Sequence, residues 1–199
     1  MVKRLKFGRN YLYEFGIMTK PFHRLLQFYS NRSPNSNAQT IRLIDSLRGN
    51  LALGLDFPAA LVVALARHVF FKNTGFFSLT IHIPKVRMET TILDGIPIDE
   101  KRNYSRSEVV SLAKKRSGWA GAGDALALWA LAADVRTGLM KGDDIVAFQE
   151  GTLHERLEER RKARTQVLPL WRGGPIFVSG HSWVVKTVFN IDVYRKKSS

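Results

Sequence analysis

The sequence predicts an α+β fold with N-terminal helices, a small antiparallel sheet, middle helices, and a C-terminal β-hairpin that joins the sheet. Apolar residues recur with helical spacing near the N-terminus and in the middle of the chain, and they alternate with a period of two between residues 77 and 93 and again in the tail. The 199 residues are 45% hydrophobic and 24% charged, as in ordinary globular proteins. We therefore expect a single domain over residues 1–199, in which residues 1–37 form a basic helical arm.

Helical spacing marks the N-terminal elements. Apolar side chains recur at i, i+3, i+4 and i+7 in the first of them: Phe22, Leu25, Leu26 and Tyr29. They predict an amphipathic helix over residues 21–30, which a loop over residues 31–37 follows. A second short helix is expected over residues 41–49. Residues 57–71 are apolar on most sides, with Pro58 in the first turn, and predict a buried helix.

Alternation predicts the strands. Residues 77–83 place apolar side chains at every second position, and a second strand over residues 86–93 meets Asp94-Gly95, a dipeptide that tolerates the positive φ of a hairpin turn. The tail alternates in the same way at Val185, Thr187, Phe189, Ile191 and Val193. Residues 175–195 are therefore expected to form the C-terminal hairpin.

Two capping boxes begin the middle and late helices. Ser105 and Glu108 stand three residues apart before an apolar run, and Thr152 and Glu155 do the same before the charged stretch that ends at residue 164. Between them, residues 121–123 read Gly-Ala-Gly. They do not fit a dinucleotide-binding fingerprint, which follows a strand, so we interpret these glycines as ending one helix and letting a buried helix over residues 123–135 pack closely.

Several classes of site are excluded by the residue content. The chain has no cysteine, which rules out disulfides, a thiolate nucleophile and cysteine-bound zinc. Its five histidines show none of the short spacings that bring two imidazoles onto one metal. His181-Ser182 lacks the strand-turn-helix context of a serine nucleophile. We therefore expect no enzymatic activity, no cofactor and no metal.

The charge is the most unusual property of the sequence. Lysine and arginine number 31 against 17 aspartates and glutamates, which gives a formal net charge of +14. The isoelectric point is about 10.4. Such an excess indicates an anionic partner, namely nucleic acid, anionic lipid or an acidic protein.

Seventeen basic side chains gather in clusters and are the candidate contacts to an anionic membrane or to nucleic acid: Lys3, Arg4, Lys6, Arg9, Lys101, Arg102, Arg106, Lys114, Lys115, Arg116, Arg160, Arg161, Lys162, Arg164, Arg195, Lys196 and Lys197. Trp119 is a further candidate for membrane or partner contact. Two structural explanations compete. Cations in a last helical turn favour the helix dipole, and a charged helix with Glu158 and Lys162 at i, i+4 is often simply solvated.

Three stretches resemble the layout of rhabdovirus matrix proteins. They are FFSLTIHI (76–83), a helix running from YSRSEVV to Trp119 and continued by GDALALWALAA, and the tail that begins PIFVSG. The resemblance covers residues 76–135 and 175–195. It implies a non-enzymatic protein that self-associates, condenses a ribonucleoprotein, and attaches it to the inner face of an anionic membrane in the virion and the host cytoplasm.

Two other functions stay open. Residues 1–44 hold eight basic side chains and one acidic side chain, Glu14, which is typical of a transit peptide. An RNA-binding component of a large ribonucleoprotein in the mitochondrial matrix, such as an organellar ribosome, is therefore the alternative. An enzyme acting on a phosphate-bearing substrate is a third reading, but no acid–base pair or nucleophile supports it.

Overall fold

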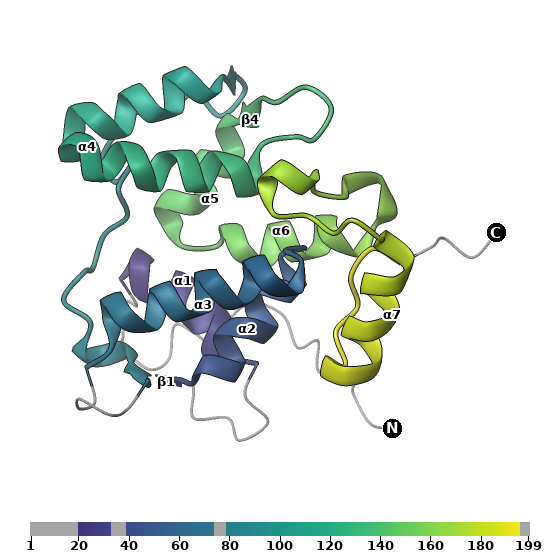
Figure 1. Ribbon diagram of the computed structural model, residues 1–199. Coiled ribbons are helices and arrows are strands. Elements are labelled where there is room, and N and C mark those ends of the chain that lie inside the picture. Colours follow the sequence, from purple (N-terminus) through teal and green to yellow (C-terminus); the bar gives the residue numbers. More distant parts are fainter. Residues whose placement is uncertain (1–19, 33–38, 74–78, 196–199) are drawn as a thin grey trace, which may run out of the picture.

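Helices build most of the chain in the computed structural model, which describes residues 20–32, 39–73 and 79–195 (Figure 1). In these ranges, seven α-helices accompany two antiparallel sheets of two strands each, so the predicted α+β class is confirmed. The elements in chain order are α1 (Pro21–Ser30), β1 (Thr40–Ile41), α2 (Leu43–Ala52), α3 (Phe57–Phe71), β2 (Ile81–His82), η1 (Ile83–Lys85), β3 (Asn103–Tyr104), α4 (Arg106–Ala132), β4 (Met140–Lys141), α5 (Gly142–Glu150), α6 (Leu153–Lys162), η2 (Arg164–Gln166), η3 (Leu170–Arg172) and α7 (Val178–Phe189).

The first three helices form where the apolar spacing and the terminal residues predict them. Pro21 occupies the first turn of α1, whose apolar side chains are buried against α2, α5 and α6. In α2 the carboxylate of Asp45 accepts a hydrogen bond of 3.0 Å from the backbone N–H of Arg42. Asp56 caps α3 by accepting from the N–H of Phe57 at 2.9 Å. Residues 1–19 and 33–37 of the predicted basic arm lie outside the described ranges.

The sheets are much smaller than predicted. β1 pairs with β2 through Thr40↔His82 and Ile41↔Ile81, and β3 pairs with β4 through residues 103–104 and 140–141. Residues 77 and 78 of the first predicted strand lie outside the described residues. The second predicted strand is wrong, because η1 turns the chain and residues 86–91 make no ladder. The Asp94-Gly95 turn does form, with Gly95 at φ 70°, but no hairpin flanks it.

The predicted C-terminal hairpin is also wrong, because residues 178–189 form helix α7. The same residues carry a helical stripe of buried and half-buried positions, Val178, Ser182, Val185 and Phe189. The hydroxyl of Ser182 donates to the carbonyl of Val178, one helical turn earlier, at 2.8 Å. Asn190 then takes the left-handed conformation (φ 53°, ψ 41°) that ends the helix.

Helix α4 folds back on itself as a hairpin without a loop (Figure 1). Its capping box is formed as predicted, since the N–H of Ser105 donates to the carboxylate of Glu108 at 2.8 Å. The reversal occurs at Gly118, whose φ of 65° and ψ of −152° are non-helical. Gly121 packs closely on the first half of the hairpin, and a Cβ there would lie 2.8 Å from the carbonyl oxygen of Ala113. The close packing predicted for the Gly-Ala-Gly segment is therefore confirmed, although the break lies at Gly118.

Gly118 also provides a test of this hairpin. Only glycine readily adopts its φ and ψ, and an added Cβ would meet no atom within 4 Å. Gly118→Ala is therefore expected to lower the free energy of unfolding by about 1–3 kcal/mol through backbone strain alone. The control is Gly123→Ala, which is helical, also open, and expected to stabilise by about 0.5–1 kcal/mol. Urea unfolding measures both, and equal effects would contradict the strained turn.

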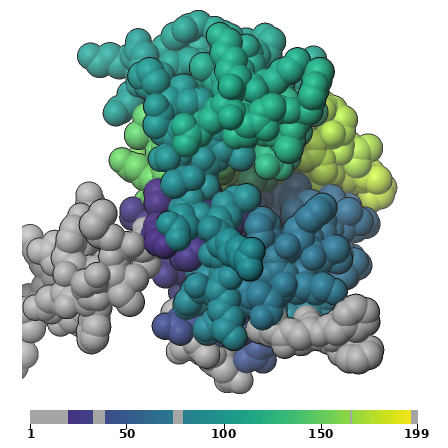
Figure 2. Space-filling model, turned by 90° about the vertical axis from the view of Figure 1, so that its left-hand side faces the viewer, coloured from purple at the N-terminus to yellow at the C-terminus, as the bar shows by residue number. Residues whose placement is uncertain are grey.

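The helices are arranged in two levels. The upper level contains the α4 hairpin with α5 and α6 beneath it. The lower level contains α1, α2 and α3, with α7 beside them (Figure 1). The chain between β2 and β3 runs along one face and joins the levels, as the teal segment in the middle of Figure 2 shows. Buried side chains from both levels form one core, which includes Leu26, Leu51, Ile81, Leu128 and Leu157.

Candidate functional site

The predicted basic contacts at the chain ends lie mostly outside the described residues: Lys3, Arg4, Lys6, Arg9, Lys196 and Lys197. They stay predictions. Arg195 is described, and its guanidinium pairs with Asp192, which also pairs with Lys186 at 3.2 Å. Such a three-member network on the surface contributes little stability, but it reduces the positive charge that Arg195 offers to an outside anion.

The four basic residues of the α6 cluster, Arg160, Arg161, Lys162 and Arg164, differ in how far they are engaged within the protein. Arg160 forms a two-pronged contact with the buried carboxylate of Asp144, with one bond of 2.6 Å, and this hydrogen bonding raises the pKa of Arg160. Lys162 pairs with Glu159, and Arg164 donates to the hydroxyl of Ser179. The predicted capping box of α6 does not form either, because the side chain of Thr152 caps no backbone N–H.

Arg161 corrects the prediction most clearly, because its side chain is only 1% exposed. Its guanidinium donates to three backbone carbonyls from separate parts of the chain: Leu53 at 3.3 Å, Gln166 at 2.8 Å and Leu131 at 2.7 Å. Burial lowers the pKa of Arg161. An arginine with all its donors directed inward cannot bind an outside phosphate, so its role is structural.

The basic residues at the start of α4 are exposed but partly engaged. Arg102 pairs with Glu108, and its guanidinium carbon lies 4.9 Å from the centre of the Tyr104 ring. The guanidinium of Arg106 lies 5.7 Å from the Trp129 ring. Lys101 is exposed, and its backbone N–H donates to the carboxylate of Asp99 at 3.0 Å. These residues lie at the end of the first α4 segment that is opposite to the hairpin tip.

The tip of the α4 hairpin combines cations with an exposed tryptophan. Trp119 follows the Gly118 reversal and is 80% exposed. The ammonium of Lys114 lies 3.6 Å from the centre of its ring, a cation–π contact, while the neighbouring Lys115 is exposed. Arg116 makes a looser contact of 3.6 Å with Asp94. The geometry brings the predicted residues 114–116 and Trp119 together; we call them the α4 tip.

The outer side of α3 is the largest departure from the sequence prediction. This helix is not buried on most sides, and its eight exposed residues are all apolar: Phe57, Pro58, Val62, Val63, Leu65, Ala66, Val69 and Phe70. Phe70 is 80% exposed. We call this surface the α3 face. A helix on the surface of a soluble domain normally directs polar side chains outward, so the polarity of α3 is inverted.

The two polar residues of α3 point inward. His68 is buried, and its Nε2 lies 2.9 Å from the hydroxyl of Ser46. Arg67 donates to the side-chain carbonyl of Asn50 at 3.1 Å and stacks on the Tyr29 ring. Burial lowers the pKa of both Arg67 and His68. These partners on α1 and α2 explain why the apolar residues are left outside.

A second apolar surface continues beside the N-terminal end of α3. It consists of Leu170, Trp171, Ile176, Phe177, Trp183, Val184 and Val188, and we call it the α7 face. The rings of Phe57 and Phe189 lie 6.3 Å apart, and Nδ1 of His181 lies 3.1 Å from the carboxylate of Asp56, so α3 and α7 are in contact. The predicted hairpin over residues 175–195 hid five of these residues, and Leu170 and Trp171 lie before it in a segment for which no element was predicted.

Comparison of the chain with protein-family models, with curated proteins and with solved structures finds no match. Within the described ranges, no group of three His, Asp or Glu side chains is placed to hold a metal ion. None of the helices assigned to those ranges is long and apolar enough to cross a membrane. The α4 tip and the two apolar faces, by their exposed cations and exposed apolar side chains, are the candidate functional surfaces of the described residues.

Proposed function

We propose that the protein is a non-enzymatic assembly protein of the matrix type. It self-associates through the α3 and α7 faces, attaches to an anionic membrane through the α4 tip, and uses its remaining positive charge to hold a ribonucleoprotein. The inverted polarity of α3 carries the proposal. The net charge of +14 supports the membrane and ribonucleoprotein contacts.

The α3 face is costly to leave in water. Burying apolar surface contributes about 25 cal/mol per Å², and soluble monomers rarely expose apolar patches larger than a few hundred Å². Here aromatic and branched side chains of α3, such as Phe70 and Val62, stand in solvent next to those of α7. A second copy of the chain offers the same apolar surface, so pairing of like faces removes both from water.

The two kinds of surface respond oppositely to salt. The α3 face contains no charged side chain among its exposed residues, so its association gains from salt that screens repulsion between highly positive copies. The α4 tip has exposed Lys114 and Lys115, so its attraction to anionic lipid weakens as salt rises. Self-association and membrane binding can therefore be separated by ionic strength.

Phe70→Glu tests self-association. The substitution places a charge at the C-terminal end of the α3 face, and we expect it to weaken self-association at 0.3 M salt by at least 10-fold, because burying an unpaired carboxylate is unfavourable. Sedimentation velocity over a range of protein concentrations measures the effect. The matched control is Ser111→Glu, which adds the same charge to an exposed position of α4.

Both variants keep their fold if Phe70 is exposed, with unfolding free energies within about 0.5 kcal/mol of the parent chain. A parent chain that stays monomeric at high concentration would refute self-association. If Phe70→Glu and Ser111→Glu weakened self-association equally, the net charge of the chain, and not the α3 face, would control self-association.

Flotation with vesicles tests the membrane contact. Lys114→Ala with Lys115→Ala should reduce binding to vesicles of phosphatidylserine and phosphatidylcholine about 30-fold, since each cation near an anionic surface contributes ~1 kcal/mol. Lys85→Ala with Arg87→Ala removes the same charge from exposed positions away from the tip and should have a smaller effect. Vesicles of phosphatidylcholine alone should not bind.

RNA binding is the discriminating outcome. A chain that ignores anionic vesicles, stays monomeric and binds structured RNA with a steep salt dependence would instead be a ribonucleoprotein component. The α3 face favours the assembly protein, because contact with phosphates leaves an apolar surface exposed.

A further inference from the structure

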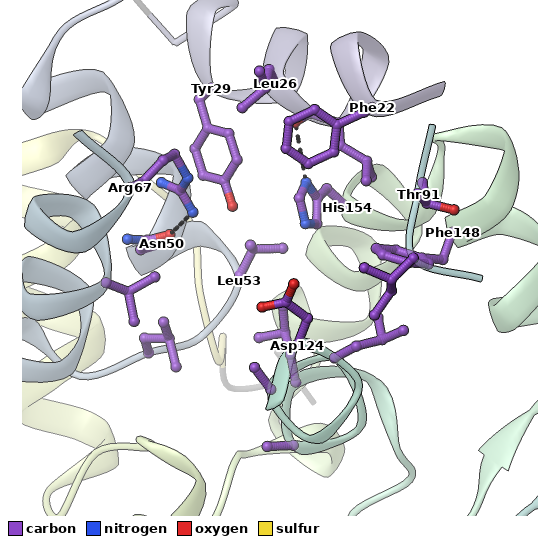
Figure 3. Close-up of a pocket in the computed structure, with 18 of the residues that line it drawn as sticks. Phe22, Leu26, Tyr29, Asn50, Leu53, Arg67, Thr91, Asp124, Phe148 and His154 are labelled. Atoms are coloured by element: carbon purple, nitrogen blue, oxygen red, sulfur yellow. Dashed lines mark hydrogen bonds between the residues drawn. The ribbon is translucent and has the colours of Figure 1, made fainter. Parts of the chain in front are cut away.

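A cavity of about 420 Å³ lies between the two levels of helices. Residues of α1, α3, the second half of α4, α5, α6 and the segment around residue 91 line it (Figure 3). Its volume falls in the range of about 300–1,000 Å³ that is usual for small-molecule sites. Four lining residues are also exposed and mark the opening to solvent: Val63, Met88, Asp124 and Ala127.

Most of the lining is apolar, and it includes Phe22, Leu25, Leu128 and Phe148. Tyr29 and Arg67 lie close together on one side of the central space, and His154, Thr91 and Asp124 are spread around the rest of it (Figure 3). Such an arrangement suits a ligand with a long or broad apolar part and a single polar head.

Arg67 is a buried cation without a carboxylate partner among the described residues. Its Nη2 donates to Asn50 at 3.1 Å and its guanidinium carbon lies 3.7 Å from the centre of the Tyr29 ring. Its Nη1 is buried and makes no hydrogen bond within the described part of the chain. A buried charge is stabilised chiefly by an opposite charge, so this guanidinium is suited to bind an anion.

Tyr29 offers a second donor at the same end. The residue is 2% exposed, its hydroxyl points into the cavity (Figure 3), and that hydroxyl makes no hydrogen bond with another described residue. His154 is neutral, because burial lowers its pKa to about 3, and its Nδ1–H donates to the carbonyl of Leu25 at 3.3 Å. The head-group end of the cavity therefore contains one cation and a free hydroxyl.

The other charged groups of the cavity do not compete for this role. Arg172 donates to the carbonyls of Trp129, Ala130 and Ala133, so its guanidinium is satisfied. Asp124 is the only carboxylate among the lining residues described, and it approaches from α4, without an ion pair to Arg67 (Figure 3).

We infer that the cavity binds an apolar monocarboxylate of the fatty-acid class. The carboxylate accepts a hydrogen bond from the hydroxyl of Tyr29 and is attracted by the positive charge of the Arg67 guanidinium, and the chain lies among the leucine and phenylalanine side chains. Of the residues that define the α3 face, the α7 face and the α4 tip, only Val63 also lines the cavity. The inference does not depend on the proposed function.

Isothermal titration calorimetry of the full chain tests the inference with three probes of equal chain length, each below its micelle concentration. Dodecanoate should bind with one site per chain. Dodecan-1-ol should bind at least 10-fold more weakly, because it lacks the charge that complements Arg67. Dodecyltrimethylammonium should show no specific binding, since its cation would approach the guanidinium.

Four variants locate the site. Arg67→Met should weaken dodecanoate at least 10-fold and leave dodecan-1-ol unchanged, and Tyr29→Phe should weaken dodecanoate about 3- to 10-fold. Ala127→Phe places a ring at the opening of the cavity and should abolish binding of both probes. Leu126→Phe, on the neighbouring exposed residue that does not line the cavity, should change neither.

The inference is overturned if dodecanoate does not bind, if the alcohol binds equally well, or if Leu126→Phe weakens binding as much as Ala127→Phe does. Should Arg67→Met fail to fold, Tyr29→Phe and Ala127→Phe decide, since Tyr29→Phe breaks no hydrogen bond of the described chain. Loss of dodecanoate binding in Ala127→Phe without loss in Phe70→Glu would separate this site from the proposed assembly surface.

Discussion

Arg161→Met is expected to lower the free energy of unfolding by about 3–5 kcal/mol, the largest effect of any single substitution considered for this protein. Methionine retains most of the buried volume but has no donor. The carbonyls of Leu53, Leu131 and Gln166 would lose their bonds of 2.7–3.3 Å to the guanidinium. Each carbonyl left buried without a partner costs about 1–3 kcal/mol, and local relaxation recovers part of the sum.

Arg156→Met on the same helix is the control. Arg156 is exposed, donates to the carbonyl of Asp143 at 3.1 Å and forms a loose ion pair of 3.9 Å with the carboxylate of that residue, so its loss should change stability by no more than about 1 kcal/mol. Urea unfolding followed by circular dichroism compares the two variants. Equal stability in Arg161→Met and Arg156→Met would mean that Arg161 does not join α6 to the segments around Leu53 and Leu131.

His154→Gln is expected to change the pH dependence of stability. Burial, assisted by repulsion from Arg67, lowers the pKa of His154 from 6.5 to about 3 in the folded state. Between these two values the unfolded chain binds a proton at His154 that the folded chain does not, so the wild-type stability falls as the pH falls. The contribution amounts to about 1.4 kcal/mol per pH unit at its steepest, between pH 6 and pH 4.

Glutamine is neutral throughout this range. In the variant, the difference in bound protons between the unfolded and folded states should therefore be smaller by about one, and the unfolding free energy should depend less steeply on pH. At pH 7 both chains carry a neutral side chain at this position, and the variant should differ from the parent by about 1 kcal/mol or less. His68 and His181 also have lowered pKa values, so part of the slope should remain in the variant. Parallel curves for the two chains would contradict the burial of His154.

Local signals predicted the elements that local interactions stabilise. Apolar spacing located α1 and α3, and the pairing of Ser105 with Glu108 fixed the start of α4, because a capping box involves only neighbouring residues. The helix break was predicted at the glycines 121 and 123, but it lies at Gly118. Several glycines stand close together there, and only their φ and ψ show which of them makes the break.

The tail shows why periodicity alone was insufficient there. Residues 185–193 alternate, but Val178, Val185 and Phe189 also share one side of a helix. Whether the segment forms a strand or a helix depends on which parts of the chain lie beside it. A strand needs an open ladder to join, whereas a helix satisfies its own backbone and needs only an apolar stripe that packs on the core.

The orientation of α3 and the burial of Arg161 could not be predicted from their neighbours in sequence. Arg67 turns inward because it contacts Asn50 and Tyr29 there. Arg161 turns inward because it donates to the carbonyl of Leu53, a residue 108 positions earlier in the chain. The cavity could not be predicted for the same reason, because its lining residues come from segments spread between Phe22 and Arg172. Lys114, Lys115 and Arg116 of the α4 tip are exposed, but their contact with an anionic partner stays a prediction.

Each strand that the described chain contains is two residues long, and its partner already occupies one side of it. A strand of another chain that paired with one of them could therefore gain few backbone hydrogen bonds. These segments offer no template for the stacking of strands into a cross-β assembly. Any higher-order particle must be built by side-chain packing between helices. Such particles should dissolve in mild detergent and reassemble when it is removed, with their helical content unchanged.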